Sequence, residues 1–292
     1  MNKIVLLAES GSDIPPDVAK KYNIYIIPMH VTFNNGTKDD GTFPAEDIIS
    51  YYRNTGKLPK TSGCIPEDFE KIFDRIHAEN PDSHILYLAY SAVTTCSYQS
   101  AVIASEERDY ISLLDTKLVS GGQYVVVVQL AKWLRRSPHA TLQEAIDEAN
   151  ILINKTRMCF YPNDLEFLKA GGRVSNIMAV CGSILKIHPR IDLEGGYLKA
   201  TKKLRGNLRK MIPKLVREYT AEQDFEKEAI WMLCSPGFTE EGKKAAEEEA
   251  YACGFQKITW VKTGCVITTH GGPEAFGIVG IKNNMAVNLQ SV

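Results

Sequence analysis

The sequence predicts an α/β protein with two domains, and three observations lead to this prediction. The chain has 292 residues, more than one small domain usually contains. In the first half, short apolar runs typical of strands alternate with longer segments of helical periodicity, an order that favours βαβ units and a mostly parallel sheet. After about residue 156 this regular alternation ends. We therefore place a first domain at residues 1–156 and a second domain, with a mixed sheet, at residues 157–292.

The first domain is expected to hold a parallel sheet flanked by helices. Its strand-like runs are Lys3–Ala8, Ile24–Phe33, His84–Ala89 and Asp109–Leu114. Its helical segments are Pro44–Arg53, Pro66–Glu79, Tyr98–Glu106, Val119–Trp133 and Leu142–Asn154. Pro44 and Pro66 suit the first turn of a helix, where an N–H group has no intrahelical partner, and the acidic residues that follow each proline favour the positive end of the helix dipole.

The second domain is expected to mix strands and helices less regularly. Its strand-like runs are Arg157–Tyr161, Lys186–Asp192, Tyr197–Ala200, Glu228–Cys234, Gln256–Val261 and a last run after Gly277. Its helical segments are Asn207–Tyr219 and Thr239–Cys253. Pro213 predicts a kink or a late start in the first of these helices, and Gly254 predicts the end of the second.

Composition excludes several classes of protein and site. With 34 Lys+Arg against 35 Asp+Glu the net charge is −1, so the chain has no basic footprint for nucleic acid. No apolar run approaches the ~20 residues that span a bilayer. The seven cysteines form no CxxC pair and the six histidines show no HxH or HExxH spacing, which argues against disulfides and metal sites and favours a reducing, cytoplasmic compartment.

Three hydroxyl-rich loops are the first candidates for a binding site. They are Glu9–Pro15, Lys60–Pro66 and Tyr90–Ala101. Each lies at the end of an expected strand or the start of an expected helix, the edge at which open α/β sheets bind ligands. Hydroxyls and free N–H groups at helix N-termini suit a small anion such as a carboxylate or phosphate. Because Ser and Thr are also preferred N-caps, a structural role is the alternative for each hydroxyl.

Two glycine-containing segments add charged or titratable candidates. In Leu168–Ser175 a pair of glycines permits close backbone approach beside Arg173, whose guanidinium is always charged; a helix C-cap followed by a surface arginine is the alternative. In Thr268–Gly277 the side chain of His270 stands in a loop of glycine and proline. There a functional role competes with a structural one.

A Ser–His–Asp hydrolase is the alternative to a binding protein. Ser91 or Ser97 could supply the nucleophile, with His270 as the base and Asp13 as its partner. The GxSxG elbow that presents such a serine in α/β-hydrolases is absent from the sequence. An esterase or thioesterase acting on acyl substrates is therefore the second hypothesis.

Six motifs, taken together and in order, resemble those of the DegV family of bacterial fatty-acid-binding proteins. They are Glu9–Pro15, Ile27–Met29 with Asp40-Gly41, Thr61–Pro66, Ser91–Ala101, Leu165–Ser175 and His270–Gly277. The resemblance covers nearly the whole chain. Departures from the family pattern concern the headgroup loops: Val93 and Cys96 replace glycines, and Glu274 replaces a glycine and adds negative charge close to the expected headgroup.

The resemblance implies a fold and a binding function. The first domain would be a three-layer α/β/α unit with a parallel sheet, and the second a two-layer α/β unit with a mixed sheet. A long-chain fatty acid would lie between them, with its tail in the second domain. The residues implied to hold its carboxylate are Thr61, Ser62, Ser91, Thr95 and His270. Arg173 would stand near the same end.

The resemblance also implies a carrier without chemistry or a cofactor of its own. Such a carrier would present the bound acid to a separate ATP-dependent fatty acid kinase, which makes the acyl phosphate. A basic loop after the central hairpin is implicated in docking that kinase, and it corresponds here to Arg205.

Overall fold

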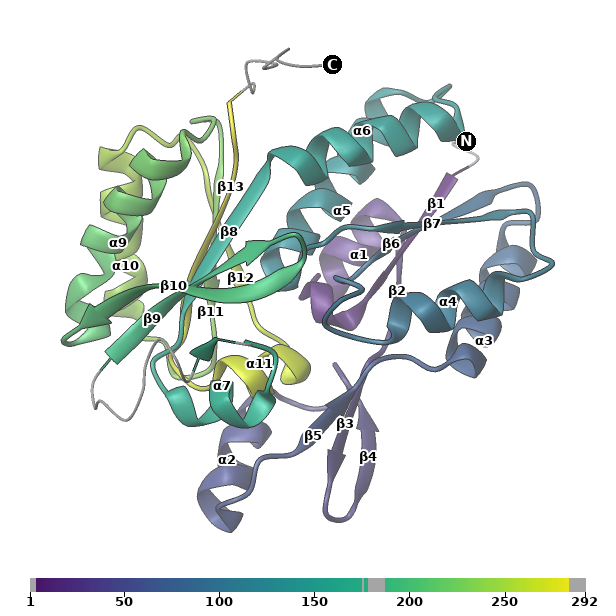
Figure 1. The fold of residues 1–292 in the computed structure, drawn as a ribbon. Coiled ribbons are helices and arrows are strands. Elements are labelled where there is room, and N and C mark those ends of the chain that lie inside the picture. The colour runs from purple at the N-terminus through teal and green to yellow at the C-terminus, as the bar shows by residue number, and fades with distance from the viewer. Residues whose placement is uncertain (1–3, 175, 178–186, 284–292) are drawn as a thin grey trace.

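The computed structural model describes residues 4–174, 176–177 and 187–283, and its layers follow one another across Figure 1. A parallel sheet and a mixed sheet lie on opposite sides of one central helix, α5 (Ser120–Arg136), and further helices cover the outer face of each sheet. Both sheet types expected from the sequence are confirmed.

The parallel sheet belongs to the first half of the chain and has the order β2-β1-β6-β7. Its strands are β1 (Ile4–Glu9), β2 (Ile24–Ile27), β6 (His84–Ala89) and β7 (Ile111–Asp115). Helices α1 (Pro16–Tyr22) and α5 cover one face of this sheet, and α6 (Leu142–Lys155) packs on α5. Helices α3 (Pro66–Glu79) and α4 (Ser97–Ser105) cover the other face. Every residue of β1 is buried because both faces are covered.

The mixed sheet belongs to the second half and has the order β10-β9-β8-β13-β11-β12. Its strands are β8 (Thr156–Tyr161), β9 (Ile187–Glu194), β10 (Tyr197–Arg205), β11 (Ile230–Cys234), β12 (Ile258–Lys262) and β13 (Phe276–Ile281). Among its described strands, β11 and β12 pair in parallel and the other neighbouring strands pair antiparallel. The helices α9 (Leu208–Gln223) and α10 (Glu240–Ala252) cover its outer face.

The central helix α5 carries the most apolar run of the sequence, Tyr124–Leu130. A helix that faces solvent on one side shows an apolar stripe, whereas a helix enclosed by two sheets is apolar all round. In α5 the side chains of Val125 and Val127 are fully buried, and Gly121 packs so closely that a Cβ there would lie 2.2 Å from Cδ2 of Leu233 in β11. The two halves of the molecule therefore share one core through α5.

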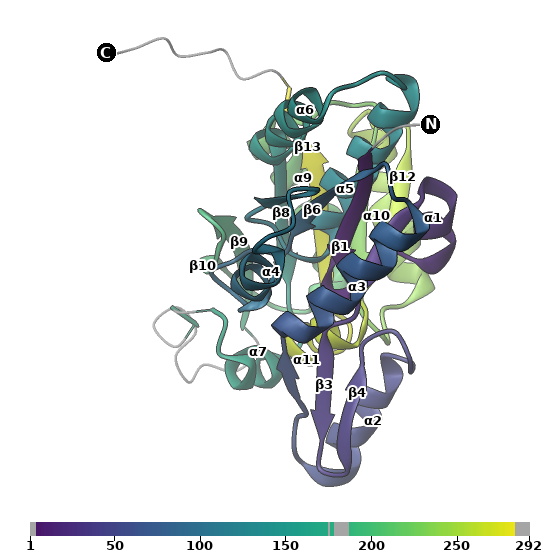
Figure 2. The ribbon, with the colours of Figure 1, turned by 90° about the vertical axis from the view of Figure 1, so that its right-hand side faces the viewer.

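A third, three-stranded sheet of order β4-β3-β5 was not predicted. It comprises β3 (His30–Phe33), β4 (Gly36–Asp39) and β5 (Lys60–Ser62), and with α2 (Glu46–Thr55) it projects beyond the main body in Figure 2. The sequence predicted one strand over Ile24–Phe33, which is wrong. The chain leaves the parallel sheet at Pro28, because proline has no N–H group for a strand ladder.

Two short helices were also missed, α7 (Leu165–Gly171) and α11 (Cys265–Gly271), which pack against each other. The expected late start of the helix near Pro213 is wrong as well. Helix α9 begins at Leu208, where the side chain of Asn207 accepts a hydrogen bond from the Arg209 N–H at 3.0 Å, and it continues through Pro213.

Candidate functional site

A cavity of about 810 Å³ opens between the two large sheets. Its polar wall comes from β5, from the loop between β6 and α4, from the segment after α7 and from α11; among its residues are Thr61, Ser62, Thr94, Thr95, Arg173 and His270. Its apolar wall comes mainly from strands of the mixed sheet, which contribute Met158, Phe160, Leu198, Leu233 and Phe276. One face of the cavity can therefore bind a polar group and the other an apolar chain.

Thr61 and His270, 209 positions apart in sequence, meet in this cavity. The Thr61 hydroxyl Oγ1 lies 2.8 Å from Nε2 of His270. Antiparallel pairing of Thr61 with Val31 of β3 fixes the threonine, and the last turn of α11 fixes the histidine. The prediction that His270 stands in a loop is wrong, because the chain is helical through Gly271 and turns only at Gly272.

The His270 imidazole is neutral at pH 7. Burial lowers its pKa to about 4, and the positive charge of nearby Arg173 acts in the same direction. Its Nδ1 atom is buried without a hydrogen-bond partner among the described residues, and a Cβ at Gly171 would lie 2.2 Å from it. A neutral imidazole can donate a hydrogen bond from one nitrogen and accept one at the other, so it can serve a carboxylate ligand as well as a hydroxyl.

Two predicted hydroxyl loops contact each other at this site. Oγ of Ser97 accepts a hydrogen bond from the Cys64 N–H at 3.1 Å and lies 3.2 Å from Oγ1 of Thr95. A Cβ at Gly63 would come within 2.3 Å of that Thr95 oxygen. The loop after β5 can approach the start of α4 this closely only because position 63 carries no side chain.

Helix α11 is tied to the first half of the molecule by two carboxylates at its N-terminus. Asp13 accepts a hydrogen bond from the Gly264 N–H at 2.7 Å, and Asp40 accepts one from the Cys265 N–H at 2.9 Å. Such bonds satisfy donors that have no partner within the helix. Burial raises the pKa of Asp13, and the nearby Asp40 raises it further. Both aspartates stand in the motifs quoted above, yet nothing in the sequence showed that they hold the helix that carries His270.

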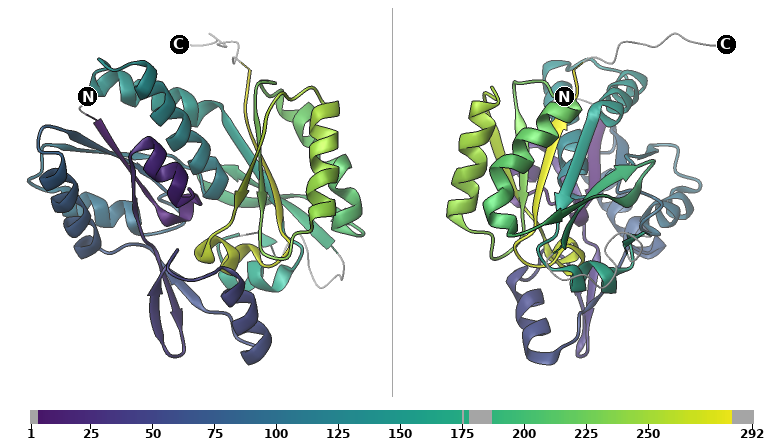
Figure 3. Two further views of the ribbon diagram at one scale, coloured as in Figure 1. Left: turned by 180° about the vertical axis from the view of Figure 1, so that it is seen from behind. Right: turned by 60° about the vertical axis from the view of Figure 1, so that its left-hand side comes forward.

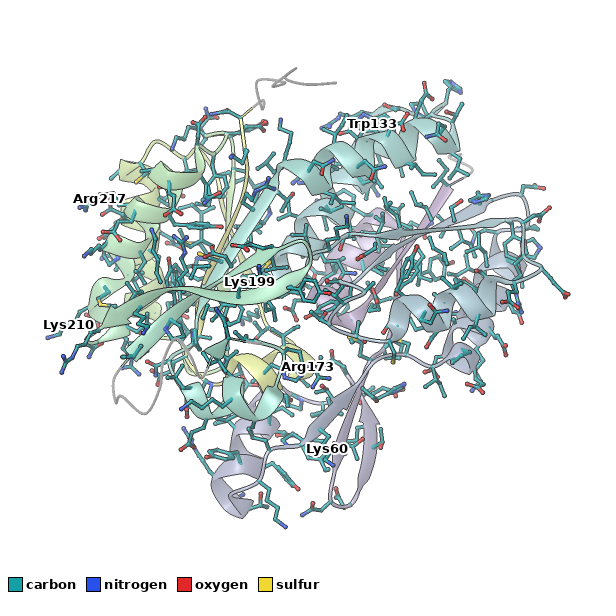
Figure 4. All side chains as sticks on the ribbon, in the orientation of Figure 1. Lys60, Trp133, Arg173, Lys199, Lys210 and Arg217 are labelled. Atoms are coloured by element: carbon teal, nitrogen blue, oxygen red, sulfur yellow. The ribbon has the colours of Figure 1, made fainter. Side chains whose placement is uncertain are left out.

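Of the predicted site residues, Ser91 and Arg205 do not line this cavity. The buried Ser91 hydroxyl donates a hydrogen bond of 2.8 Å to the Gly196 carbonyl at the turn between β9 and β10. Arg205 is exposed at the end of β10. The other five (Thr61, Ser62, Thr95, Arg173 and His270) do line it, and Figure 4 shows Arg173 above Lys60 of β5. The carboxylate and docking roles remain predictions.

The charge of Glu274 is paired within the protein. Its carboxylate lies 2.7 Å from Nη2 of Arg209 and accepts a hydrogen bond from the Asn163 amide at 3.3 Å. Its φ of 57° falls in the left-handed region, which glycine adopts without strain. This explains why a glycine suits the position in the family pattern and how the charge of Glu274 is accommodated here.

The described residues show neither a metal-binding cluster nor a membrane-spanning helix. Over residues 4–174, 176–177 and 187–283, no group of three or more His, Cys, Asp or Glu side chains is placed to bind a metal ion. None of the helices in this described part of the chain is long and apolar enough to cross a membrane.

Comparisons with known proteins agree with this architecture. The sequence model of the family described as "Uncharacterised protein, DegV family" matches residues 3–283. A fatty acid-binding protein of Thermotoga maritima is 30% identical over 284 residues, covering 94% of this chain and 96% of that protein. A DegV domain-containing protein of Caldanaerobacter subterraneus is 26% identical, covering 95% of this chain and 98% of that protein.

Solved structures show the same fold. The structure of a fatty-acid-binding DegV family protein from Thermus thermophilus superposes with a TM-score of 0.86 at 25% identity, covering 97% of this chain and all (100%) of that one. A Thermotoga maritima protein whose structure revealed a fatty acid binding function gives a TM-score of 0.81 at 27% identity, with 96% and 100% covered. This chain therefore belongs to the DegV family.

Proposed function

We propose that this protein binds one long-chain fatty acid in the cavity between its two large sheets. The carboxylate would lie at Thr61, Ser62, Thr95 and His270, and the acyl chain along the apolar wall of the mixed sheet. The observation that carries this proposal is the pairing of a hydroxyl and imidazole cluster with an apolar wall in one cavity. Fatty acid binding by the similar Thermotoga and Thermus proteins supports it.

The apolar wall supplies the affinity. Moving an acyl chain out of water stabilises the complex by roughly 0.8 kcal/mol per methylene, from which the entropic cost of binding must be subtracted. Side chains of Met158, Leu233 and Phe276, each at most 4% exposed, form a dry surface for that chain.

The polar wall determines which end of the ligand lies there. A carboxylate that leaves bulk water needs charge-assisted hydrogen bonds. The hydroxyls of Thr61 and Thr95 can donate such bonds, and the neutral His270 can donate one from its ring. The guanidinium of Arg173 adds a positive charge beside the site without enclosing the carboxylate.

We further propose that the bound acid is presented to an ATP-dependent fatty acid kinase. The exposed Arg173 and Arg205 would face that partner. In this role the chain needs no nucleophile, because the kinase supplies the chemistry. Acyl phosphate formed by the kinase from loaded wild-type protein, and reduced at least tenfold with Arg205→Ala at unchanged fatty acid affinity, would support docking through Arg205.

The alternative, a serine–histidine esterase, requires a serine hydroxyl at His270. The observed bonds differ: Ser91 donates to the Gly196 carbonyl, Ser97 accepts from the Cys64 N–H, and the hydroxyl beside His270 belongs to Thr61. Hydrolysis of p-nitrophenyl acyl esters that disappears in His270→Ala would support hydrolase activity, but with the Thr61 hydroxyl in place of a serine.

The carboxylate assignment is tested by calorimetric titration of palmitate into Thr61→Val. Loss of one hydrogen bond to a charged group costs about 1.5–3 kcal/mol, so we expect at least tenfold weaker binding. Thr37→Val is the matched control, because it makes the same change on exposed β4, outside the cavity. Ser91→Ala should weaken binding less than Thr61→Val. Equal affinity of Thr61→Val and Thr37→Val would contradict the assignment.

A further inference from the structure

A second large cleft lies between the helices α1, α5 and α6 and one edge of the mixed sheet. It has a volume of about 1390 Å³ and is walled by α1, α5 and α6 on one side and by β11, β12 and the segments leading into them on the other. Figure 3 (left) shows α1, α5 and these strands from behind. Of the described residues, none lines both this cleft and the cavity of the proposed fatty acid site.

Four cations from separate segments line this cleft. They are Lys21 of α1, Lys132 and Arg136 of α5, and Lys257 just before β12. Within the described ranges, none of the four has a carboxylate oxygen within 4.0 Å. The cations thus come together from three parts of the chain.

Lys132 is the centre of this cluster and is only partly exposed. Burial lowers the pKa of its ammonium, and the charges of Lys257, Arg136 and Lys21 lower it further. The repulsion among these groups costs free energy that a bound anion would remove.

Four carboxylates of the described residues also line the cleft. Asp17, Glu148, Glu226 and Glu228 contribute. Glu226 is paired with Lys155 at 2.5 Å, and Glu228 opposes the repulsion at Lys132 less strongly than each of the three other cations contributes to it. Lys257, Arg136 and Lys21 therefore act on Lys132 more strongly than Glu228 does.

We propose that this cleft binds a small anion of the phosphate-ester class, with Lys132 at its base and Lys21, Arg136 and Lys257 around the phosphate. Lysine and arginine supply the charge and the N–H donors that phosphate oxygens accept. The neighbouring side chains of Tyr22, Leu152 and Trp231 provide an apolar surface for the organic part of such an ester. An anion held there bridges α5 and the mixed sheet.

The test is calorimetric titration of inorganic pyrophosphate into the full-length protein at low ionic strength. We expect saturable binding that weakens at least tenfold in Lys132→Met and in Lys257→Met. Lys210→Met is the matched control: this exposed lysine of α9 points away from the cleft on the far side of the mixed sheet (Figure 4). Because Lys257 is exposed, its substitution keeps the test valid even if Lys132→Met folds poorly.

A parallel arm uses vesicles of phosphatidylglycerol, which offer the phosphate as a lipid headgroup. Binding of pyrophosphate that depends on Lys132 and Lys257 supports the cleft as a site for the phosphate of a soluble anion. No saturable binding, equal loss in Lys210→Met, or binding to vesicles alone would overturn the proposal. Because the two cavities share none of the residues that the structure describes, palmitate titration of Lys257→Met reports separately on the proposed fatty acid site.

Discussion

At the scale of single residues, the polar end of the cavity depends on Gly171, because the absence of a side chain there leaves room for the His270 ring. His270 packs against Gly171 so closely that its Nδ1 would lie 2.2 Å from an added Cβ. Gly171 has no positive φ, so alanine is acceptable to the backbone itself. A methyl group at this position therefore acts on the histidine rather than on the chain.

This contact makes Gly171→Ala a selective probe. We expect the added methyl to displace His270 and to weaken palmitate binding about tenfold, since a misplaced donor loses its bond to the carboxylate. In the His270→Ala background the same change should have little further effect, because the clash is gone. Calorimetric titration of the four proteins in this cycle measures the coupling; additive losses would contradict the assigned contact.

The depressed pKa of His270 predicts a pH dependence of stability. The folded state takes up the proton only near pH 4, whereas the unfolded chain takes it up near the ordinary histidine value of 6.5. Between these values the unfolded state binds more protons, so acidification lowers the free energy of unfolding. From pH 7 to pH 5 this loss is at most about 2 kcal/mol.

His270→Gln should remove that part of the pH dependence. Urea unfolding of wild type and variant at both pH values measures it, and the comparison cancels the opposite contributions of buried Glu9 and Asp13, whose pKa values are raised. Identical pH dependence of the two proteins would show that His270 titrates normally in the folded state.

The sequence identified some residues of the candidate site better than others. Thr61, Thr95 and His270 stand in motifs rich in hydroxyls and glycine, so their residue types pointed to a polar site. The apolar side chains of Leu198 and Phe276 look like any strand core, and only the packing of the two halves shows that they face a cavity.

At the scale of elements, α11 joins the two halves of the molecule. It comes from the second half of the sequence, yet its N-terminus is held by Asp13 and Asp40, and it packs in the core beneath the parallel sheet through Cys265 and Val266. The position of His270 therefore depends on carboxylates more than 200 residues away in sequence.

Asp40→Ala should both destabilise the protein and weaken palmitate binding. Loss of a side chain that accepts a hydrogen bond from a free N–H group at a helix N-terminus costs about 1–2 kcal/mol, and Asp40 also accepts a hydrogen bond from the Ser10 hydroxyl at 2.8 Å. Urea unfolding and palmitate titration measure the two effects, with Asp82→Ala, a change at an exposed position, as the control. If Asp40→Ala kept the wild-type free energy of unfolding and the wild-type palmitate affinity, the Asp40 carboxylate would not position α11.

Elements with a strong local signal were predicted well, and those without one were not. Helix α3 matches its predicted bounds of Pro66–Glu79, because a first-turn proline and an apolar stripe mark it. The seven-residue helices α7 and α11 are too short to show a helical period. The small sheet escaped prediction because β5 pairs with β3 across α2, a contact that no local pattern encodes.

At the scale of the whole molecule, α5 and the order of the strands create the cavity. The alternating first half predicted a parallel sheet, since short crossovers leave few other arrangements. The sequence predicted that the second sheet is mixed, but it did not predict the order of its strands. The strand β13, which comes last in sequence, lies between β8 and β11. That insertion places Phe276 in the cavity wall, and no periodicity in the sequence specifies it.

The central claim is that a fatty acid occupies this cavity, and native mass spectrometry after addition of palmitate tests it most directly. Leu198 lines the cavity, whereas its neighbour Tyr197 is 53% exposed, so Leu198→Trp fills the space and Tyr197→Trp is the matched control. We predict one palmitate per chain for wild type and Tyr197→Trp, and markedly less for a folded Leu198→Trp. Absence of palmitate from the wild type, or equal occupancy in all three proteins, would contradict the account.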